Sequence, residues 1–264
     1  MTTFPPVVKQ EASSAILLYH SLDRSGTIFS TDPGAFHAHL DVLVESGIET
    51  VPLEEVQKTP GAIALTFDDG YNNFREHALP FLIERGLPAT LFVVSGHCGG
   101  TRKWGSRVGP MVNEPLLSWR ELREIAAAGV TIGAHTVSHD NLVSLPEEKV
   151  IREMRDCRIE IEDQIGKPVN VFAYPYGNSN RRIRRLAQQE FRMACGTRLS
   201  LVDKTSDPFD LPRIFDFYVR NTYLNGPLRL RKLNQTEGRV YLAVRRWVSR
   251  TRDLFRSVGQ ALPR

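Results

Sequence analysis

Two carboxylates directly follow an apolar segment of this sequence. Residues 62–67 have the pattern of a buried strand, and Asp68, Asp69 and Gly70 come next. Adjacent carboxylates at a strand end repel each other unless a positive charge lies beside them. The pair therefore predicts a cation nearby, and it leaves one of the two acids available as a general base.

A second apolar segment, 130–134, is followed by two histidines four positions apart, His135 and His139. One carboxylate and two imidazoles form a three-ligand metal set that leaves a coordination position open for water. Such a set suits zinc and also accepts cobalt, nickel or iron. On their own, the histidines could instead cap or solvate the start of a helix. Together with the paired acids they indicate a metal-dependent hydrolase.

Three segments in this order carry a resemblance to a known family. They are Thr-Phe-Asp-Asp-Gly at 66–70, His-Thr-Val-Ser-His at 135–139 and Phe-Ala-Tyr-Pro-Tyr-Gly at 172–177. They resemble the signature motifs of the polysaccharide deacetylases, carbohydrate esterase family 4 with its NodB-homology domain. The similarity covers residues 15 to about 220. It implies that Asp69, His135 and His139 hold a divalent metal, usually Zn²⁺ (with Co²⁺, Ni²⁺ or Fe²⁺ as alternatives), and that Asp68 is the general base.

The same resemblance implies a general acid that protonates the departing amine. Most members supply a histidine near the C-terminal end of the domain, but no histidine follows His139 here. His20, directly after the apolar run 15–19, resembles the permuted arrangement of exopolysaccharide deacetylases. We expect His20 to be the acid, the alternative being a structural histidine at a strand end.

One position departs from the family pattern. Many members carry an arginine three residues before Tyr176, where it orients the base, but this chain has Ala173. Arg213, in the run 211–214, is our candidate for supplying the guanidinium. A surface salt bridge would explain Arg213 equally well.

The remaining site residues are expected to bind substrate. The backbone N–H of Tyr176 matches the family's oxyanion hole. Tyr174, Pro175 and Tyr176 would line the groove, and Trp104 is a candidate for stacking on a sugar ring. The ring of Tyr176 could equally be ordinary groove wall.

The resemblance implies a carbohydrate N-deacetylase, which hydrolyses the N-acetyl group of an amino sugar to acetate and a free amine. Three alternatives stay open. The same residues could remove O-acetyl groups, or they could hydrolyse a non-sugar amide. The protein could also be a metal-containing glycan-binding protein that has lost turnover.

Apolar runs alternate with helical patterns along the chain. Strands are predicted at 15–19, 62–67, 89–94, 130–134, 169–174 and 193–197, and helices at 33–45, 74–84, 118–128, 144–165 and 181–190. This alternation predicts an α/β fold with a parallel sheet or barrel. The candidate site residues mostly follow strand ends, where such barrels build active sites. The resemblance implies an irregular (β/α) barrel of about seven parallel strands, against the standard eight. We expect residues 96–117 to form a long loop at the end of the barrel that carries the candidate site.

Charge is unevenly distributed over the 264 residues. Residues 213–264 hold 12 Lys and Arg against 3 Asp and Glu, whereas the remainder holds 22 against 27. We expect an N-terminal tail (1–14), a catalytic domain (15–220) and a basic C-terminal extension (221–264). Within the extension, 238–260 reads as an amphipathic basic helix that packs either on the barrel or on an anionic membrane.

The expected partner is an N-acetylated glycan. If the basic helix binds a membrane, this glycan could be lipid-linked. No nucleic acid is expected, because neither a recognised fold nor an aromatic platform accompanies the charge. Residues 1–14 lack an apolar signal core, and no run approaches a membrane span of roughly 18 apolar residues. A cytoplasmic location, with peripheral contact at the inner membrane surface, is the expectation. The three cysteines lack the spacing of metal ligands, and we expect them to be thiols without a chemical role.

Overall fold

The computed structural model describes residues 12–105 and 114–218. The basic extension, including the helix expected at 238–260, and residues 1–11 of the N-terminal tail lie outside the described residues.

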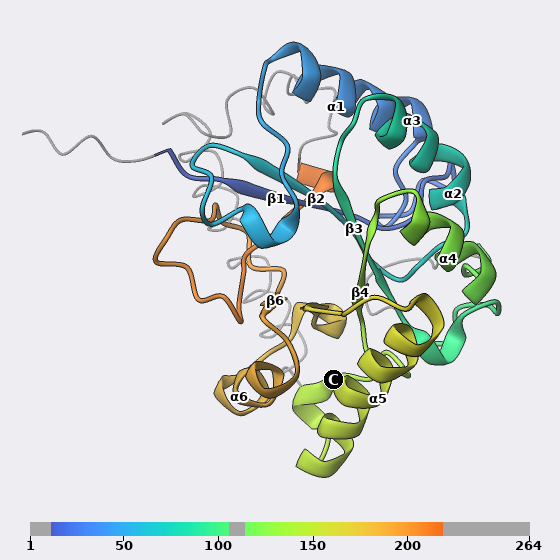
Figure 1. Cartoon of the computed structure of the whole chain (residues 1–264), viewed down its shortest axis with the longest axis vertical. Coiled ribbons are helices and arrows are strands. Elements are labelled where there is room, and N and C mark those ends of the chain that lie inside the picture. The colour runs from blue at the N-terminus through green and yellow to red at the C-terminus, as the bar shows by residue number, and fades with distance from the viewer. Residues whose placement is uncertain (1–11, 106–113, 219–264) are drawn as a thin grey trace, which may run out of the picture.

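Seven parallel strands form one curled sheet (Figure 1). In sheet order they run β6-β5-β4-β3-β2-β1-β7. Their bounds are β1 Ala15–Tyr19, β2 Ile63–Phe67, β3 Ala89–Val93, β4 Thr131–Ala134, β5 Val171–Ala173, β6 Met193–Cys195 and β7 Ile214–Phe215. The predicted α/β fold is confirmed, and so are the about seven strands that the family resemblance implied; β7 is additional to the six strands predicted from the apolar runs.

The last described strand brings the two edges of the sheet together. Ile214 in β7 pairs with Leu17 in β1, and Leu211, just before β7, forms a parallel bridge with Cys195 in β6. The segment 211–215 therefore touches both the first strand and the sixth. The sheet is curled into an irregular barrel, and Arg213 lies at its seam.

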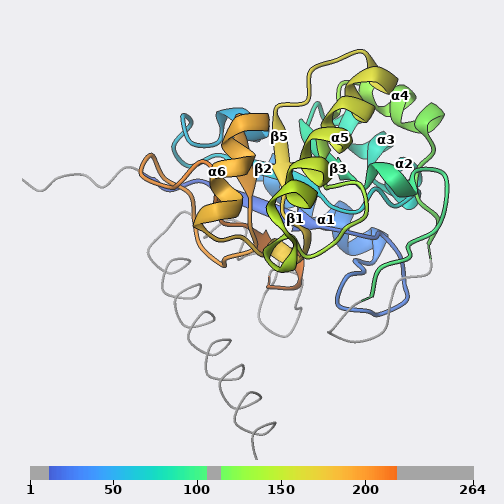
Figure 2. The ribbon, with the colours of Figure 1, turned by 90° about the horizontal axis from the view of Figure 1, so that it is seen from below.

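Six α-helices are described, and those from α1 to α5 follow one another along the outer side of the sheet (Figure 1). Their bounds are α1 Pro33–Glu45, α2 Asn73–His77, α3 Leu79–Glu84, α4 Trp119–Ala127, α5 Glu147–Ile165 and α6 Arg181–Glu190. α6 packs beside α5, as the view from below also shows (Figure 2).

The single helix expected at 74–84 is wrong, because the chain forms two helices there. Pro80 has no N–H to donate to the carbonyl of Glu76, so the hydrogen-bond ladder is interrupted between them. Ala78, at the junction, has φ −100° and ψ −53°, which departs from ideal helix geometry.

Buried side chains form a core on each face of the sheet, because successive strand residues point to opposite faces. Leu17 and Leu65 belong to the larger core, which the helices cover. Ile16 and Ala64 belong to a second core inside the barrel, together with Phe92 from β3. By the same alternation Asp68 continues the inner face of β2, so its position follows from the strand pattern.

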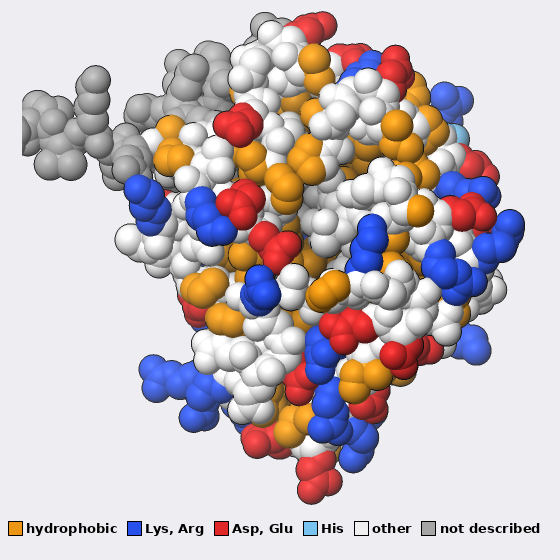
Figure 3. All heavy atoms as spheres, viewed as in Figure 1, with side chains coloured by type: hydrophobic (Ala, Val, Ile, Leu, Met, Phe, Trp, Pro, Cys, Tyr) orange, Lys and Arg blue, Asp and Glu red, His pale blue; other side chains and the backbone are white. Residues whose placement is uncertain are grey.

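The outer surface carries charges of both signs. Over α4 and α5, Figure 3 shows basic and acidic side chains interspersed, and ion pairs such as Arg158–Glu162 (2.8 Å) account for part of the pattern. Among residues 12–105 and 114–218, no helix is long and apolar enough to cross a membrane.

Candidate active site

Strand register places the first candidate residues at one level of the barrel. Tyr19 in β1 pairs with Phe67 in β2, so His20 and Asp68 are the next residues along two neighbouring strands. The N–H of Asp68 donates to the carbonyl of Tyr19 (3.0 Å), which extends this pairing by one residue. The carboxyl ends of parallel strands thus deliver both side chains to the same mouth.

Asp69, His135 and His139 converge at that mouth. Their potential ligand atoms all lie within 4.8 Å of one another. Asp69 Oδ1 lies 3.6 Å from His135 Nε2 and 3.4 Å from His139 Nε2. All three side chains are buried. The structure therefore brings together the three residues that the sequence predicted as metal ligands.

The two imidazoles are prepared to accept a cation. His135 Nδ1 lies 2.7 Å from the carbonyl oxygen of Ala173, and because a carbonyl can only accept, Nδ1 carries the proton and Nε2 has a lone pair. Burial, reinforced by the nearby charges of His135 and Arg102, holds the pKa of His139 well below its usual range. His139 is therefore neutral at physiological pH, as a metal ligand must be.

The donor set fits a divalent metal. Asp69 Oδ1 is buried and has no hydrogen-bond partner anywhere in the described part of the chain. An unpaired buried carboxylate oxygen is costly, and a cation between it and the two Nε2 atoms would remove that cost. One carboxylate oxygen and two imidazole nitrogens are ligands that zinc accepts, with further positions open.

The backbone of the site is strained. Four non-glycine residues of the described chain have positive φ: Asp69 (72°), Thr136 (69°), His139 (61°) and Tyr176 (60°). All four lie in the three signature segments. Each such residue costs of order 1–3 kcal/mol and persists where the surrounding structure fixes it. The strain is concentrated in the turns that carry the candidate metal ligands and Tyr176.

Glu153 of α5 holds the histidine segment in place. Its carboxylate accepts hydrogen bonds from the backbone N–H groups of Val137 (3.0 Å) and Ser138 (2.9 Å) and from the Ser138 hydroxyl (2.8 Å). Our sequence reasoning missed this residue. A signal was present, because Glu153 interrupts the helix face on which Val150 and Cys157 are buried.

Arg213 reaches Asp68 from the seam of the barrel. Its Nη1 and Nη2 lie 2.7 Å from Asp68 Oδ1 and Oδ2, a bidentate pair, and Nε donates to the carbonyl of Gly196 (2.9 Å). Arg213 is 1% exposed, so this is not a surface salt bridge. Burial acts to raise the pKa of Asp68, but the charges of Arg213 and His135 outweigh it and the pKa lies below its ordinary value. Asp68 is therefore ionised at neutral pH.

His20 lies at the same mouth between two aromatic rings. Its ring makes edge contacts with Phe29 (5.2 Å between centroids) and Phe215 (5.1 Å). Burial lowers its pKa, while the charges of Asp69 and Asp68 act in the opposite direction without restoring the ordinary value. Its Nδ1 is buried and has no hydrogen-bond partner among residues 12–105 and 114–218.

The predicted groove residues differ in exposure. Tyr176 is 43% exposed, and its ring contacts His139 at 4.7 Å between centroids. Tyr174 and Pro175 are buried, and the Tyr174 hydroxyl donates to the carbonyl of Phe209 (2.9 Å). Tyr174 and Pro175 thus present little surface at the groove, and their role in lining it stays a prediction.

Trp104 is also buried rather than open to a sugar. It is 6% exposed and stacks on His139, with ring centroids 4.6 Å apart and 21° between planes. Its ring therefore covers a candidate metal ligand, and its predicted role in stacking on a sugar stays a prediction.

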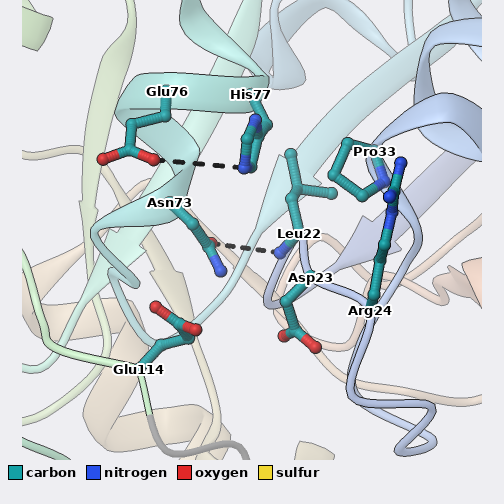
Figure 4. Close-up of a pocket in the computed structure, with 8 residues that line it drawn as sticks. All are labelled: Leu22, Asp23, Arg24, Pro33, Asn73, Glu76, His77 and Glu114. Carbon is teal, nitrogen blue, oxygen red and sulfur yellow. Dashed lines mark hydrogen bonds and ion pairs between the residues drawn. The ribbon is translucent and has the colours of Figure 1, made fainter.

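A separate polar pocket of about 370 Å³ lies between the segment after β1 and helix α2 (Figure 4). Asp23, Glu76 and Glu114 are among its lining residues, and Asn73 Oδ1 accepts a hydrogen bond from the N–H of Leu22 (3.0 Å). Asp68, Asp69, His135 and His139 do not line it. The pocket is thus distinct from the site at the strand ends.

Comparison with known proteins identifies the family. The polysaccharide deacetylase family model matches residues 55–193, more than half of the chain. The match spans Asp68, Asp69, His135 and His139 but excludes His20 and Arg213.

Individual relatives agree with this match. The chain is 25% identical to YxkH of Bacillus subtilis over 215 residues, covering 78% of this chain and 72% of that protein. It is 32% identical to the chitooligosaccharide deacetylase of Rhizobium leguminosarum bv. trifolii over 110 residues, covering 41% of this chain and 43% of that enzyme. The chain thus matches less than half the length of the Rhizobium enzyme.

A solved structure shares the fold. The deacetylase PplD of Streptococcus pyogenes, determined in complex with acetate, aligns with a TM-score of 0.66 at 22% identity, over 78% of this chain and 93% of that one. The family match, the strand order and the converging acid and histidine side chains lead to one assignment. The chain belongs to the polysaccharide deacetylase family, hydrolases that act on carbon–nitrogen bonds other than peptide bonds.

Proposed function

We propose that this protein is a metal-dependent N-deacetylase that hydrolyses the acetamido group of an amino sugar in an oligosaccharide or polysaccharide. The observation that carries the proposal is the placement of an ionised acid beside a ligand set. Asp68 Oδ2 lies 4.0 Å from His135 Nε2, and Asp69 Oδ1 lies 3.6 Å from the same nitrogen. A reacting group at this point would meet both the ligand set and the base.

Asp69, His135 and His139 would hold the cation, most simply Zn²⁺. When bound, a divalent cation polarises an acyl carbonyl and makes water more acidic. Asp68 would accept the proton of the attacking water. Its bidentate contact with Arg213 keeps the carboxylate ionised and fixes both oxygens in one orientation.

His20 would donate a proton to the nitrogen that leaves as the free amine. The side chain is at the mouth, and its Nδ1 has no hydrogen-bond partner among the described residues. The half-exposed ring of Tyr176, which lies against His139, would support the sugar. Its backbone N–H is our candidate for the oxyanion contact.

Oligomers of N-acetylglucosamine are the substrates we would test first. The printed name of the Rhizobium relative, a chitooligosaccharide deacetylase, supports this substrate class. The experiment is acetate release from N-acetylated oligosaccharides by the zinc-loaded protein and by the variants Asp68→Asn and His20→Ala, with His77→Ala as the histidine control.

We expect wild type and His77→Ala to release acetate. Loss of the base or the acid should lower kcat by roughly 10²- to 10⁴-fold. Prior treatment with a chelator should abolish turnover, and added zinc should restore it. Tight zinc binding without acetate release from any glycan would redirect the proposal to a non-sugar amide or to a binding role. Full activity of His20→Ala would remove the acid assignment alone.

The basic extension supports a further part of the proposal. A cluster of arginines and apolar residues at 238–260 suits contact with an anionic membrane surface, and hence a cytoplasmic enzyme acting on a lipid-linked glycan. The test is sedimentation with anionic liposomes, comparing the full chain with a chain ending at residue 235. Equal sedimentation of both would reject the anchor.

A further inference from the structure

Arg102 carries a charge that the described structure does not neutralise. Its Nε and Nη1 are buried, and neither forms a hydrogen bond with any described residue. Its guanidinium carbon lies 5.5 Å from the ring centroid of Trp104 and 5.8 Å from that of Phe29. Two aromatic rings therefore hold the cation of this partly buried side chain, while no carboxylate partner for it appears among the described contacts.

Two more hydrogen-bond donors lie beside this guanidinium. Trp104 Nε1 is buried and has no acceptor in the described part of the chain. The Tyr71 hydroxyl is buried as well and forms no hydrogen bond of normal geometry with a described residue. Tyr71 and Trp104 belong to the same buried cluster, so the phenol lies on the same side of the site as the indole.

The same rings connect Arg102 with the catalytic centre. Trp104 contacts Arg102 and also stacks on His139 at 4.6 Å. Phe29 contacts Arg102 and also packs against His20 at 5.2 Å. Arg102 is thus one ring away from a candidate metal ligand and one ring away from the candidate acid. A group bound to it would belong to the substrate, next to the reacting acetamide.

Building on the proposed function, we infer that Arg102, Tyr71 and Trp104 form a subsite for a carboxylate on the glycan. A guanidinium and a carboxylate match in shape and charge. Tyr71 and Trp104 would each contribute one neutral donor. The preferred substrate would then carry an acidic sugar close to the acetylated one.

The matched probes are one oligosaccharide in two forms. The first alternates N-acetylglucosamine with glucuronic acid, and the second is the same molecule with its carboxylates converted to methyl esters. Binding to the full chain is measured by calorimetry, which needs no turnover, and acetate release is measured beside it. Arg102→Gln removes the charge, Arg102→Lys keeps it, and Lys103→Gln removes a charge from the exposed neighbouring residue.

We expect wild type and Lys103→Gln to bind the acid form at least tenfold more tightly than the ester. A hydrogen bond to a charged group is worth roughly ten- to hundredfold in affinity, so Arg102→Gln should lose this preference and Arg102→Lys should keep part of it. Equal binding of the acid and the ester by wild type would overturn the inference without any variant. Equal weakening of both forms in Arg102→Gln would also overturn it, because that result indicates a packing role.

Failure of the proposed function gives a different result. A preference for the acid form that depends on Arg102, without acetate release from either probe, would support the subsite and refute the deacetylase proposal. Acetate release from both probes at the same KM would support the deacetylase proposal and refute the subsite.

Discussion

Replacement of Arg213 by methionine should destabilise the protein strongly at neutral pH. The variant removes the bidentate partner of Asp68 and leaves a carboxylate that is 3% exposed. Removing one member of a buried ion pair costs about 3–5 kcal/mol of the free energy of unfolding. For a domain of this size that corresponds to a fall in Tm of roughly 10 °C.

The pH dependence follows from the same pair. In the wild type the pKa of Asp68 is depressed, so its contribution to stability is present above the unfolded pKa and is lost as the pH falls through the folded pKa. In the variant, burial acts without Arg213 and the folded pKa should rise above the ordinary value. The ionised form then destabilises the fold, and protonation removes that penalty. The difference in Tm should therefore be largest near pH 7 and should shrink in acid.

The assay is thermal unfolding between pH 4 and pH 8 with a chelator present, so that no cation contributes. Arg184→Met is the matched control, because Arg184 pairs with Asp207 at 3.2 Å but is 32% exposed, where such pairs are worth roughly 0–1 kcal/mol. The double variant Asp68→Asn/Arg213→Met should be more stable than Arg213→Met alone, because it removes the orphan charge. A Tm for Arg213→Met equal to that of the control at pH 7 would refute this account of the pair.

Three further predictions concern other parts of the site. Glu153→Gln should weaken zinc affinity by roughly tenfold or more, as measured by competition with a chromophoric chelator, since the histidine segment loses a charged acceptor. Gly133→Ala should cost about 1–3 kcal/mol in urea unfolding, because its Cβ would lie 2.5 Å from Phe92 Cδ1; an unchanged midpoint would contradict the packing described. Acetate release should decline as the pH rises through the lowered pKa of His20, which lies on the acidic side of its ordinary value, because the acidic form of His20 is then lost; the decline should be absent in the residual activity of His20→Ala.

Local signals in the sequence were enough to predict most elements. The helix at 33–45 was predicted with its observed bounds, since Asp32 caps it by accepting from the N–H groups of Gly34 and Ala35 and Pro33 opens it. The helix expected at 118–128 is present as α4, and the capping box of Ser118 and Glu121 opens it. The three cysteines are free, as their spacing indicated. The break between α2 and α3 was not predicted, because the helical pattern of this segment is continuous apart from Pro80.

The site was harder to predict, because several of its contacts depend on long-range geometry. Motif spacing pointed to Asp68, and the register of β1 and β2 then brings His20 to the same level. Nothing local in the sequence reveals that Trp104 stacks on His139, or that Arg102 lies near both. Those contacts arise where residues 102–104 lie against His139. The sequence shows which side chains such a segment carries, but it does not show which distant residues they contact.

The seam of the barrel also sets the order in which activity can appear during synthesis. Asp68 and Arg213 are 145 residues apart, and β7 pairs with β1, so the inner layer is complete only when the region around residue 213 has joined the first strand. A nascent chain that already contains both histidines and both acids still lacks the cation that Asp68 requires. Contacts of such long sequence separation form late and slowly. On the proposed roles of these residues, catalysis is tied to completion of the barrel, and an unfinished chain on the ribosome would not yet act on acetylated glycans.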